Sequence, residues 1–170
     1  MRLIILGAGG YGRTVYDLAH QSGRYDSIAF LDDNADGPAI FGKCSDYLSF
    51  VDGQTEMYPA FGNNTGRLIW LDKLAAAGIS VPTMIHPTAY VSPMAIIGPG
   101  CVILPKAVVN TGTMVERGCI VNCGAIVDHD CVLGEGVHVC LGAIVKAENK
   151  IPSCMKVEAG EVIENRTYLL

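Results

Sequence analysis

The sequence predicts two consecutive parts, a small α/β unit over residues 1–80 and a coil of very short strands over residues 81–170. Three observations support this division. A glycine-rich turn follows an apolar strand at the N-terminus, an aliphatic residue recurs at every sixth position from Ile85 onward, and Gly or Pro occupies many of the intervening corners. A helix is excluded in the second part, because six is no multiple of 3.6 and the corner residues would break it.

The composition excludes several classes of protein. Half of the 170 residues are hydrophobic and only 17% are charged, so the chain is not disordered. No apolar run approaches the ~18 residues of a membrane span. The run Leu3 to Leu6 is also shorter than the ~7 apolar residues of a secretory signal. We therefore expect a cytoplasmic protein with no membrane span.

Charge and cysteine content exclude further partners. The 12 Lys and Arg face 17 Asp and Glu, a net charge of −5, and form no basic cluster, so we expect no nucleic-acid partner. The seven cysteines are odd in number and contain no CxxC pair, which predicts neither a disulfide framework nor a metal site. A reducing cytoplasm fits both the odd number of cysteines and the absence of a CxxC pair.

The six-residue repeat is the strongest pattern in the chain. Its fifteen aliphatic positions are Ile85, Val91, Ile97, Ile103, Val109, Val115, Val121, Val127, Leu133, Val139, Val145, Ile151, Val157, Ile163 and Leu169. A mostly small residue lies two positions before each one, as at Cys101, Cys119 and Cys131. Two side chains two residues apart point to the same side of a strand, so both tracks are predicted to face inward between successive turns.

The first 80 residues have the order of one half of a Rossmann fold. A strand at Arg2–Leu6, a turn of GxGxxG form and a helix at Arg13–Gln21 precede a strand at Ile28–Leu31. The glycines of the turn would let the backbone approach a phosphate at a helix N-terminus. These predicted phosphate-binding residues are Gly7, Gly9, Gly10 and Gly12.

Polar residues at two strand ends complete this predicted site. Asp32 and Asp33 end the second strand, where they would meet sugar hydroxyls. A third strand, Met57–Phe61, leads to Gly62, Asn63 and Asn64, and a helix is expected at Arg67–Ala77. Because a dinucleotide normally needs two such halves, a mononucleotide is favoured over NAD.

The hexads, of which Ile97-Gly98-Pro99-Gly100-Cys101-Val102 is typical, resemble those of the hexapeptide-repeat acyltransferases. The run of GAGGYG, LDD, FGNN and IHPTA before the hexads resembles the PglD/NeuD-type sugar acyltransferases in particular. This resemblance implies a left-handed parallel β-helix with three hexads per coil. It also implies a homotrimer that uses acetyl-CoA to acetylate a UDP-linked amino-sugar, with the nucleotide held by the N-terminal half.

One segment carries the predicted chemistry. His129 lies two positions after inward Val127, at a corner, so its ring should point outward, where a neutral imidazole can accept a proton. The resemblance implies that His129 is the general base and that Asp130 orients it. It also implies that Asn122 and His138 lie near the acyl donor, and backbone near Gly142 is predicted to hold the donor's nucleotide end.

Several alternatives remain open from the sequence. Spacing does not separate an amine acceptor from a hydroxyl, so a sialic-acid-type O-acetyltransferase is the second interpretation. The third is a non-catalytic trimeric scaffold, since the C-terminal part is about two coils shorter than is typical of the family. For the same reason we expect loose, salt-sensitive acetyl-CoA binding. The basic residues available to the donor are Lys146, Lys150, Lys156 and Arg166.

Two further predictions concern the outward side chains. Apolar Val102, Ile120, Ile126 and Val132 would be covered by neighbouring subunits of the trimer. Cys131 faces inward and should be inert, which disfavours an acyl-enzyme, whereas Cys123 and Cys140 fall on outward tracks and are the better candidates for reactivity.

Overall fold

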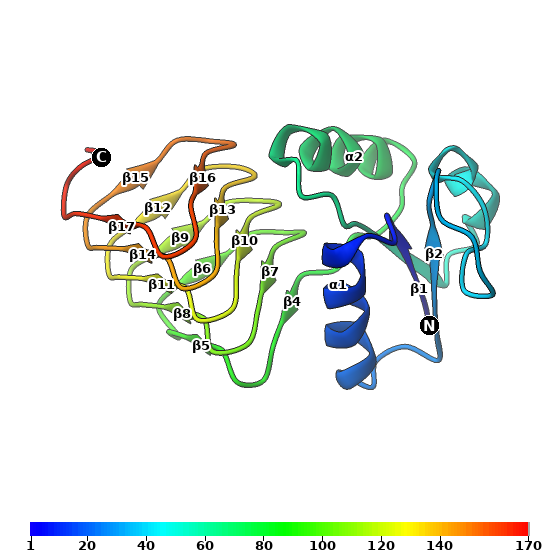
Figure 1. Cartoon of the computed structure of the whole chain (residues 1–170), viewed down its shortest axis with the longest axis horizontal. Coiled ribbons are helices and arrows are strands. Elements are labelled where there is room, and N and C mark those ends of the chain that lie inside the picture. Colours follow the sequence, from blue (N-terminus) through cyan, green and yellow to red (C-terminus); the bar gives the residue numbers. More distant parts are fainter. Residues whose placement is uncertain (170) are drawn as a thin grey trace. The chain divides into compact units, whose positions relative to one another are not determined.

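The computed structural model describes residues 1–169, which fall into two compact units, one spanning Met1–Pro82 and the other beginning at Thr83. The first unit contains a parallel three-stranded sheet in the order β2-β1-β3 (Figure 1). Its elements are β1 (Arg2–Leu6), α1 (Gly10–Gln21), β2 (Ser27–Leu31), η1 (Cys44–Phe50), β3 (Thr55–Pro59) and α2 (Asn64–Ala76).

The core of the first unit forms around β1. Leu3, Ile4, Ile5 and Leu6 are all fully buried, as expected for a central parallel strand covered on both faces. Ile4 and Leu6 pack in one cluster with Leu74 of α2. Helix α1 packs against β1 and β2, so the sheet holds the N-terminus of this helix at the carboxyl ends of the strands.

Both helices begin three residues before the predicted starts. Helix α1 begins at Gly10, so half of the glycine-rich turn forms its first turn. Helix α2 begins at Asn64, because the side chain of Asn63 caps it by accepting the N–H of Gly66 at 2.7 Å. The short 3-10 helix η1 was not predicted, since seven residues are too few to establish a hydrophobic period.

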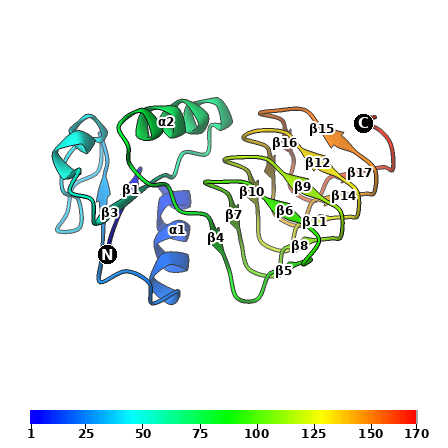
Figure 2. The ribbon, with the colours of Figure 1, turned by 180° about the vertical axis from the view of Figure 1, so that it is seen from behind.

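The second unit is a left-handed parallel β-helix of two-residue strands, as predicted (Figures 1 and 2). The strands are β4 (Met84–Ile85), β5 (Tyr90–Val91), β6 (Ile96–Ile97), β7 (Val102–Ile103), β8 (Val108–Val109), β9 (Met114–Val115), β10 (Ile120–Val121), β11 (Ile126–Val127), β12 (Val132–Leu133), β13 (His138–Val139), β14 (Ile144–Val145), β15 (Lys150–Ile151), β16 (Lys156–Val157) and β17 (Val162–Ile163).

These strands stack into three sheets, each strand pairing with the one a full coil away. The first sheet has the order β16-β13-β10-β7-β4, the second β17-β14-β11-β8-β5 and the third β15-β12-β9-β6. The second residue of every strand belongs to the predicted aliphatic series. From Ile103 to Ile163 these residues form the buried core together with the small track, including Cys101, Cys119 and Cys131.

The series fails at its last member. Leu169 is 73% exposed and lies outside the strands, whereas Tyr168 packs against the core cluster. The backbone at this end is held by the buried side chain of Asn149, whose Oδ1 accepts the N–H of Tyr168 at 2.9 Å. This bond fixes residue 168 rather than residue 169 over the core.

The outward residues of the strands do not all require a neighbouring subunit. Val102 and Ile120 of the first sheet are fully buried within the single chain, so the prediction that other subunits cover these two is wrong. On the second sheet the outward residues are all apolar, and Tyr90, Ile126 and Val162 are exposed. No helix within residues 1–169 is long and apolar enough to cross a membrane.

Candidate functional site

His129 and Asp130 form a hydrogen-bonded pair at the corner between β11 and β12. The Nδ1 of His129 lies 2.8 Å from Oδ2 of Asp130, and the two side chains are 44% and 59% exposed. Since a carboxylate only accepts, Nδ1 carries the proton and donates it to Asp130. The neutral ring therefore keeps its lone pair on Nε2.

The electrostatics of this corner favour a basic imidazole. The hydrogen bond that His129 donates to Asp130 is the main cause that raises the pKa of His129, and the negative charges of Asp128, Asp130 and Glu148 act in the same direction. A ring with a raised pKa and an exposed Nε2 can take a proton from a substrate that approaches the corner.

The preceding coil holds this corner in place. The buried hydroxyl of Thr113 donates to the carbonyl of Asp128 at 2.6 Å and accepts the N–H of Cys131 at 3.2 Å. The N–H of Asp130 donates to the carbonyl of Thr111 at 3.0 Å.

The Asp128 carboxylate accepts two donors, the amide of Asn110 and the N–H of His129. Asp128 is thus a structural residue of the corner.

Asp130 adopts a backbone conformation that is unfavourable for a residue with a side chain. Its φ is +55°, in the left-handed region, where several other corners carry glycine. The same conformation occurs at four other corners without glycine, Lys106, Glu148, Cys154 and Arg166, so it belongs to the corners of the β-helix in general and does not by itself mark the site.

Asn122 and His138 are brought together by pairing of β10 with β13. Asn122 Oδ1 accepts the N–H of Cys123 at 2.8 Å, so its amide nitrogen is the atom 3.0 Å from Nε2 of His138. This nitrogen donates, and His138 Nε2 therefore accepts. A neutral His138 has its proton on Nδ1 in this arrangement.

One chain does not bring all predicted catalytic and donor residues together. Asn122 and His138 belong to the first sheet and its corner with the second, whereas His129 lies at the corner between the second and third sheets. Gly142 follows the first sheet, with φ +63° and open space where a side chain would be.

The basic residues predicted to meet the donor are mostly paired already. Lys146 contacts Glu164, Lys156 contacts Glu158 and Arg166 contacts Glu148, at 2.6 to 2.9 Å. A phosphate would therefore compete with carboxylates for three of these four cations.

Two of the cysteines that the sequence singled out, Cys131 and Cys140, are poor nucleophiles. Cys131 is fully buried, its Sγ donates to the carbonyl of Lys146 at 3.2 Å, and burial raises the pKa of its thiol. The prediction of reactivity is wrong for Cys140, because it is 6% exposed and burial also raises the pKa of its thiol. Cys123 is half-buried.

The four glycines of the N-terminal turn have different roles. A Cβ on Gly12 would lie 1.9 Å from the carbonyl oxygen of Gly7, and Gly7 itself has φ +99° beside Ala60 and Phe61. Both are therefore required by the fold. Gly9 and Gly10 have open space where a side chain would be, at the N-terminus of α1. These two are free to let a ligand approach.

The carboxylate of Asp32 is largely occupied by the backbone. Its Oδ2 accepts the N–H of Ala8 at 2.7 Å, and Oδ1 accepts those of Asn34 and Ala35. The hydrogen bond from Ala8 is the main cause that lowers the pKa of Asp32. Asp33 accepts the N–H of Cys44 at 2.9 Å.

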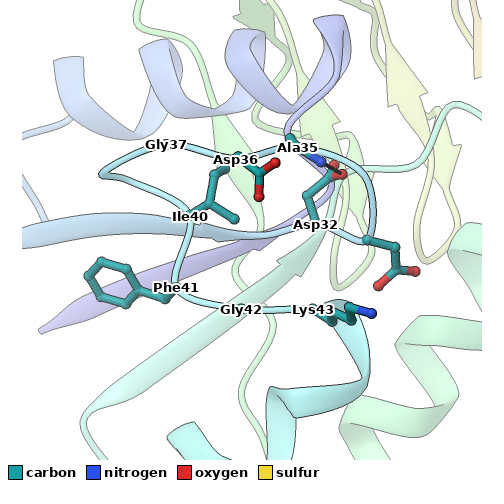
Figure 3. Close-up of a pocket in the computed structure, with 9 residues that line it drawn as sticks. Asp32, Ala35, Asp36, Gly37, Ile40, Phe41, Gly42 and Lys43 are labelled. Carbon is teal, nitrogen blue, oxygen red and sulfur yellow. Dashed lines mark hydrogen bonds between the residues drawn. The ribbon is translucent and has the colours of Figure 1, made fainter.

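An open pocket of about 320 Å³ lies beside these aspartates (Figure 3). It is lined by Asp32, Asp33, Ala35, Asp36, Gly37, Ile40, Phe41, Gly42 and Lys43. The sequence did not indicate the residues after Asp33, because they form an irregular segment with no period and no motif.

The Gly62 to Asn64 segment is built around a charged residue that the sequence analysis did not identify. Arg67 is fully buried, and its guanidinium donates to the carbonyl of Phe61 at 2.9 Å and to Oδ1 of Asn64 at 3.0 Å. Asn63 caps α2, and Gly62 has open space where a side chain would be. The sequence did contain a signal for this buried residue, because Arg67 stands among the apolar positions of the predicted helix.

Within residues 1–169 no three His, Cys, Asp or Glu side chains are grouped so that they could hold a metal ion.

The chain matches proteins of known structure. Residues 2–74 match the family described as the PglD N-terminal domain. The acetyltransferase domain of PglB from Neisseria gonorrhoeae FA1090 has a TM-score of 0.92 and 37% identity, over 97% of this chain and 83% of that one. The same domain in complex with acetyl coenzyme A matches equally well, over 97% and 82%.

A more distant structure shares the fold. PerB from Caulobacter crescentus, in complex with CoA and GDP-perosamine, has a TM-score of 0.84 and 24% identity, over 97% of this chain and 89% of that one. No curated protein matches the chain significantly.

Proposed function

The chain belongs to the PglD/NeuD-type sugar acyltransferases, and on that premise we propose that it transfers the acetyl group of acetyl-CoA to the amino group of a UDP-linked amino-sugar. The observation that carries the proposal is the exposed His129–Asp130 pair, with Nδ1 bonded to the carboxylate and Nε2 left as a base.

His129 has the properties that direct transfer needs. As the sugar nitrogen bonds to the acetyl carbon, Nε2 accepts the proton that this nitrogen loses. The carbon–sulfur bond of the thioester then breaks, and the departing sulfur of CoA takes up that proton from the imidazolium. Asp130 stabilises the imidazolium between these steps. No acyl-enzyme is needed, in keeping with the buried, protonated thiol of Cys131.

The N-terminal unit supports a nucleotide-linked acceptor. The open backbone at Gly9 and Gly10 lies at the N-terminus of α1, where a helix attracts phosphate. One sheet of three strands offers a single crevice at the carboxyl ends of its strands, which suits a mononucleotide.

A homotrimer is part of the proposal. The outward residues of the second sheet form an unbroken apolar column of Tyr90, Val108, Ile126, Ile144 and Val162. A neighbouring β-helix packed on this column would cover apolar surface. It would also allow His129 of one subunit to meet Asn122 and His138 of another.

The decisive experiment is incubation of the protein with acetyl-CoA and a panel of sugar nucleotides, read by mass spectrometry. The panel pairs UDP- and GDP-linked amino-sugars with the same sugars bearing a hydroxyl, and His129→Gln is the control enzyme. We expect acetylation of a UDP-linked amine that His129→Gln loses. Acetylation of the hydroxyl sugar alone, or of no member by the parent protein, would contradict the proposal.

A further inference from the structure

We propose that Gly112 is a positioning residue for the site at His129: by having no side chain, it leaves the space in which the Asp130 carboxylate lies against the imidazole. The inference rests on the proposed function only for the role of His129 as a base. The contact between Gly112 and Asp130 is independent of that role.

The geometry leaves no room for a side chain at residue 112. A Cβ on Gly112 would lie 2.3 Å from Oδ1 of Asp130 and 3.3 Å from its Cγ. The other carboxylate oxygen, Oδ2, is the atom that accepts the hydrogen from His129 at 2.8 Å. Oδ1 of Asp130 therefore lies over Gly112, while Oδ2 accepts the hydrogen bond from the imidazole of His129.

The carboxylate is the part that would move. The backbone nitrogen of Asp130 would lie 3.7 Å from the added Cβ, an ordinary contact, and its N–H is bonded to the carbonyl of Thr111. The Asp130 side chain is 59% exposed and can rotate. A methyl group at residue 112 would therefore turn the carboxylate away from His129 and leave the backbone in place.

The next coil limits where the carboxylate can go. Glu148 occupies the equivalent corner there, and it is bound by Arg166 at 2.7 and 3.0 Å. Asp128, Asp130 and Glu148 are the negative groups that act on His129. A carboxylate displaced toward that corner would approach the like charge of Glu148, which disfavours a move in that direction.

The chain offers a control that separates this contact from backbone strain. Gly112 has φ +69°, which disfavours any residue with a side chain. Gly160 has φ +71° at another corner and nothing within 4 Å of its Cβ position. Alanine at either residue introduces the same strain, but only alanine at residue 112 reaches Asp130.

The test compares Gly112→Ala with Gly160→Ala in the full chain, by NMR titration of the His129 ring. We expect the pKa of His129 to fall toward its ordinary value of about 6.5 in Gly112→Ala and to stay at the parent value in Gly160→Ala. An unchanged pKa in Gly112→Ala would overturn the inference. If Gly112→Ala does not fold, Gly112→Asn replaces it, because Asn tolerates the left-handed conformation.

A double-mutant cycle with Asp130→Gly adds a second test. Once the carboxylate is absent, Gly112→Ala should change neither the pKa of His129 nor kcat further. A further loss of kcat in that background would show that Gly112 acts by another route and would overturn the inference. A lowered pKa with unchanged kcat in Gly112→Ala would support the positioning role and instead contradict His129 as the base.

Discussion

The hydrogen bond between His129 and Asp130 sets the form in which the imidazole exists at a given pH. Because Asp130 raises the pKa of His129, the ring is protonated up to a higher pH than an isolated imidazole. A general base acts only when it is neutral, so its activity should fall as pH drops through this raised pKa.

Asp130→Asn should shift that pH dependence in a defined direction. Removing the charge lowers the pKa of His129, so the acid limb of kcat/KM should move to lower pH, while the plateau rate falls because the ring is less well oriented. Rates of parent and variant across pH, with the same acceptor, measure the shift. A limb that stays in place or moves upward would argue against Asp130 as the partner of the base.

Asp130→Gly should separate stability from activity. Glycine relieves the left-handed backbone at residue 130, and we expect the free energy of unfolding to rise by roughly 0.5–1 kcal/mol, after allowing for the more flexible unfolded chain. Asp130→Ala keeps the strain and should give no such gain. Denaturant unfolding checks both, and lower stability in Asp130→Gly would mean that the carboxylate stabilises the corner.

At several single residues the sequence did not distinguish a ligand contact from a contact within the fold. The sequence identified Gly7 and Gly12 as phosphate-binding residues, yet the fold requires glycine at both, Gly12 by its contact with the carbonyl of Gly7 and Gly7 by its positive φ. Asn63 and Asn64 have structural partners in α2 and Arg67. A motif specifies residue types and spacing, but it does not contain the distances that separate a ligand contact from a contact within the fold.

At the scale of elements, the β-helix was far more predictable than the α/β unit. Its strands from β4 to β17 follow from the repeat, since each hexad must return an aliphatic side chain to the same interior. The irregular segment after Asp33 and the 3-10 helix η1 have no such period, and their pocket became apparent only in three dimensions.

The N-terminus of α1 yields a prediction at this scale. Gly9→Val should fold normally, because φ −66° suits valine and nothing lies within 4 Å of the added Cβ, but it should weaken UDP-sugar binding by steric exclusion of phosphate. Gly12→Ala should instead destabilise the unit, since its Cβ would overlap the carbonyl of Gly7. Calorimetry and thermal unfolding distinguish the two, and unchanged UDP-sugar affinity in Gly9→Val would contradict the phosphate site.

At the scale of the whole molecule, the question is which residues from different corners act together. The Asn122–His138 pair and His129 lie on different sides of one β-helix, and a single sequence does not reveal which surfaces meet between copies. The resemblance to the family predicted a trimer, whereas the apolar outward column of the second sheet is an observation of the structure.

Mixed assemblies would test the proposed trimer directly. His129→Ala should lower the rate by roughly 10²–10⁴ for loss of the base, and His138→Ala should also lower the rate. If each site takes His129 from one chain and His138 from another, unfolding and refolding the two variants together restores both residues at about one quarter of the sites. Recovery of activity supports sites between subunits. No recovery from a mixture that light scattering shows to be trimeric would contradict them.

The pairing of each strand with the one a full coil away constrains how the length of this chain can change. His138, for instance, pairs with Ile120 on one side and Lys156 on the other, at a constant interval of 18 residues. Inserting or removing one such interval after β13 would lengthen or shorten the β-helix and leave every following residue on its own sheet. A change of six residues would move each following side chain to the next sheet, while a change of one would turn aliphatic residues outward. An internal change of length after β13 therefore keeps every following strand on its own sheet only in whole coils, and such a change leaves the corner that carries His129 as it is.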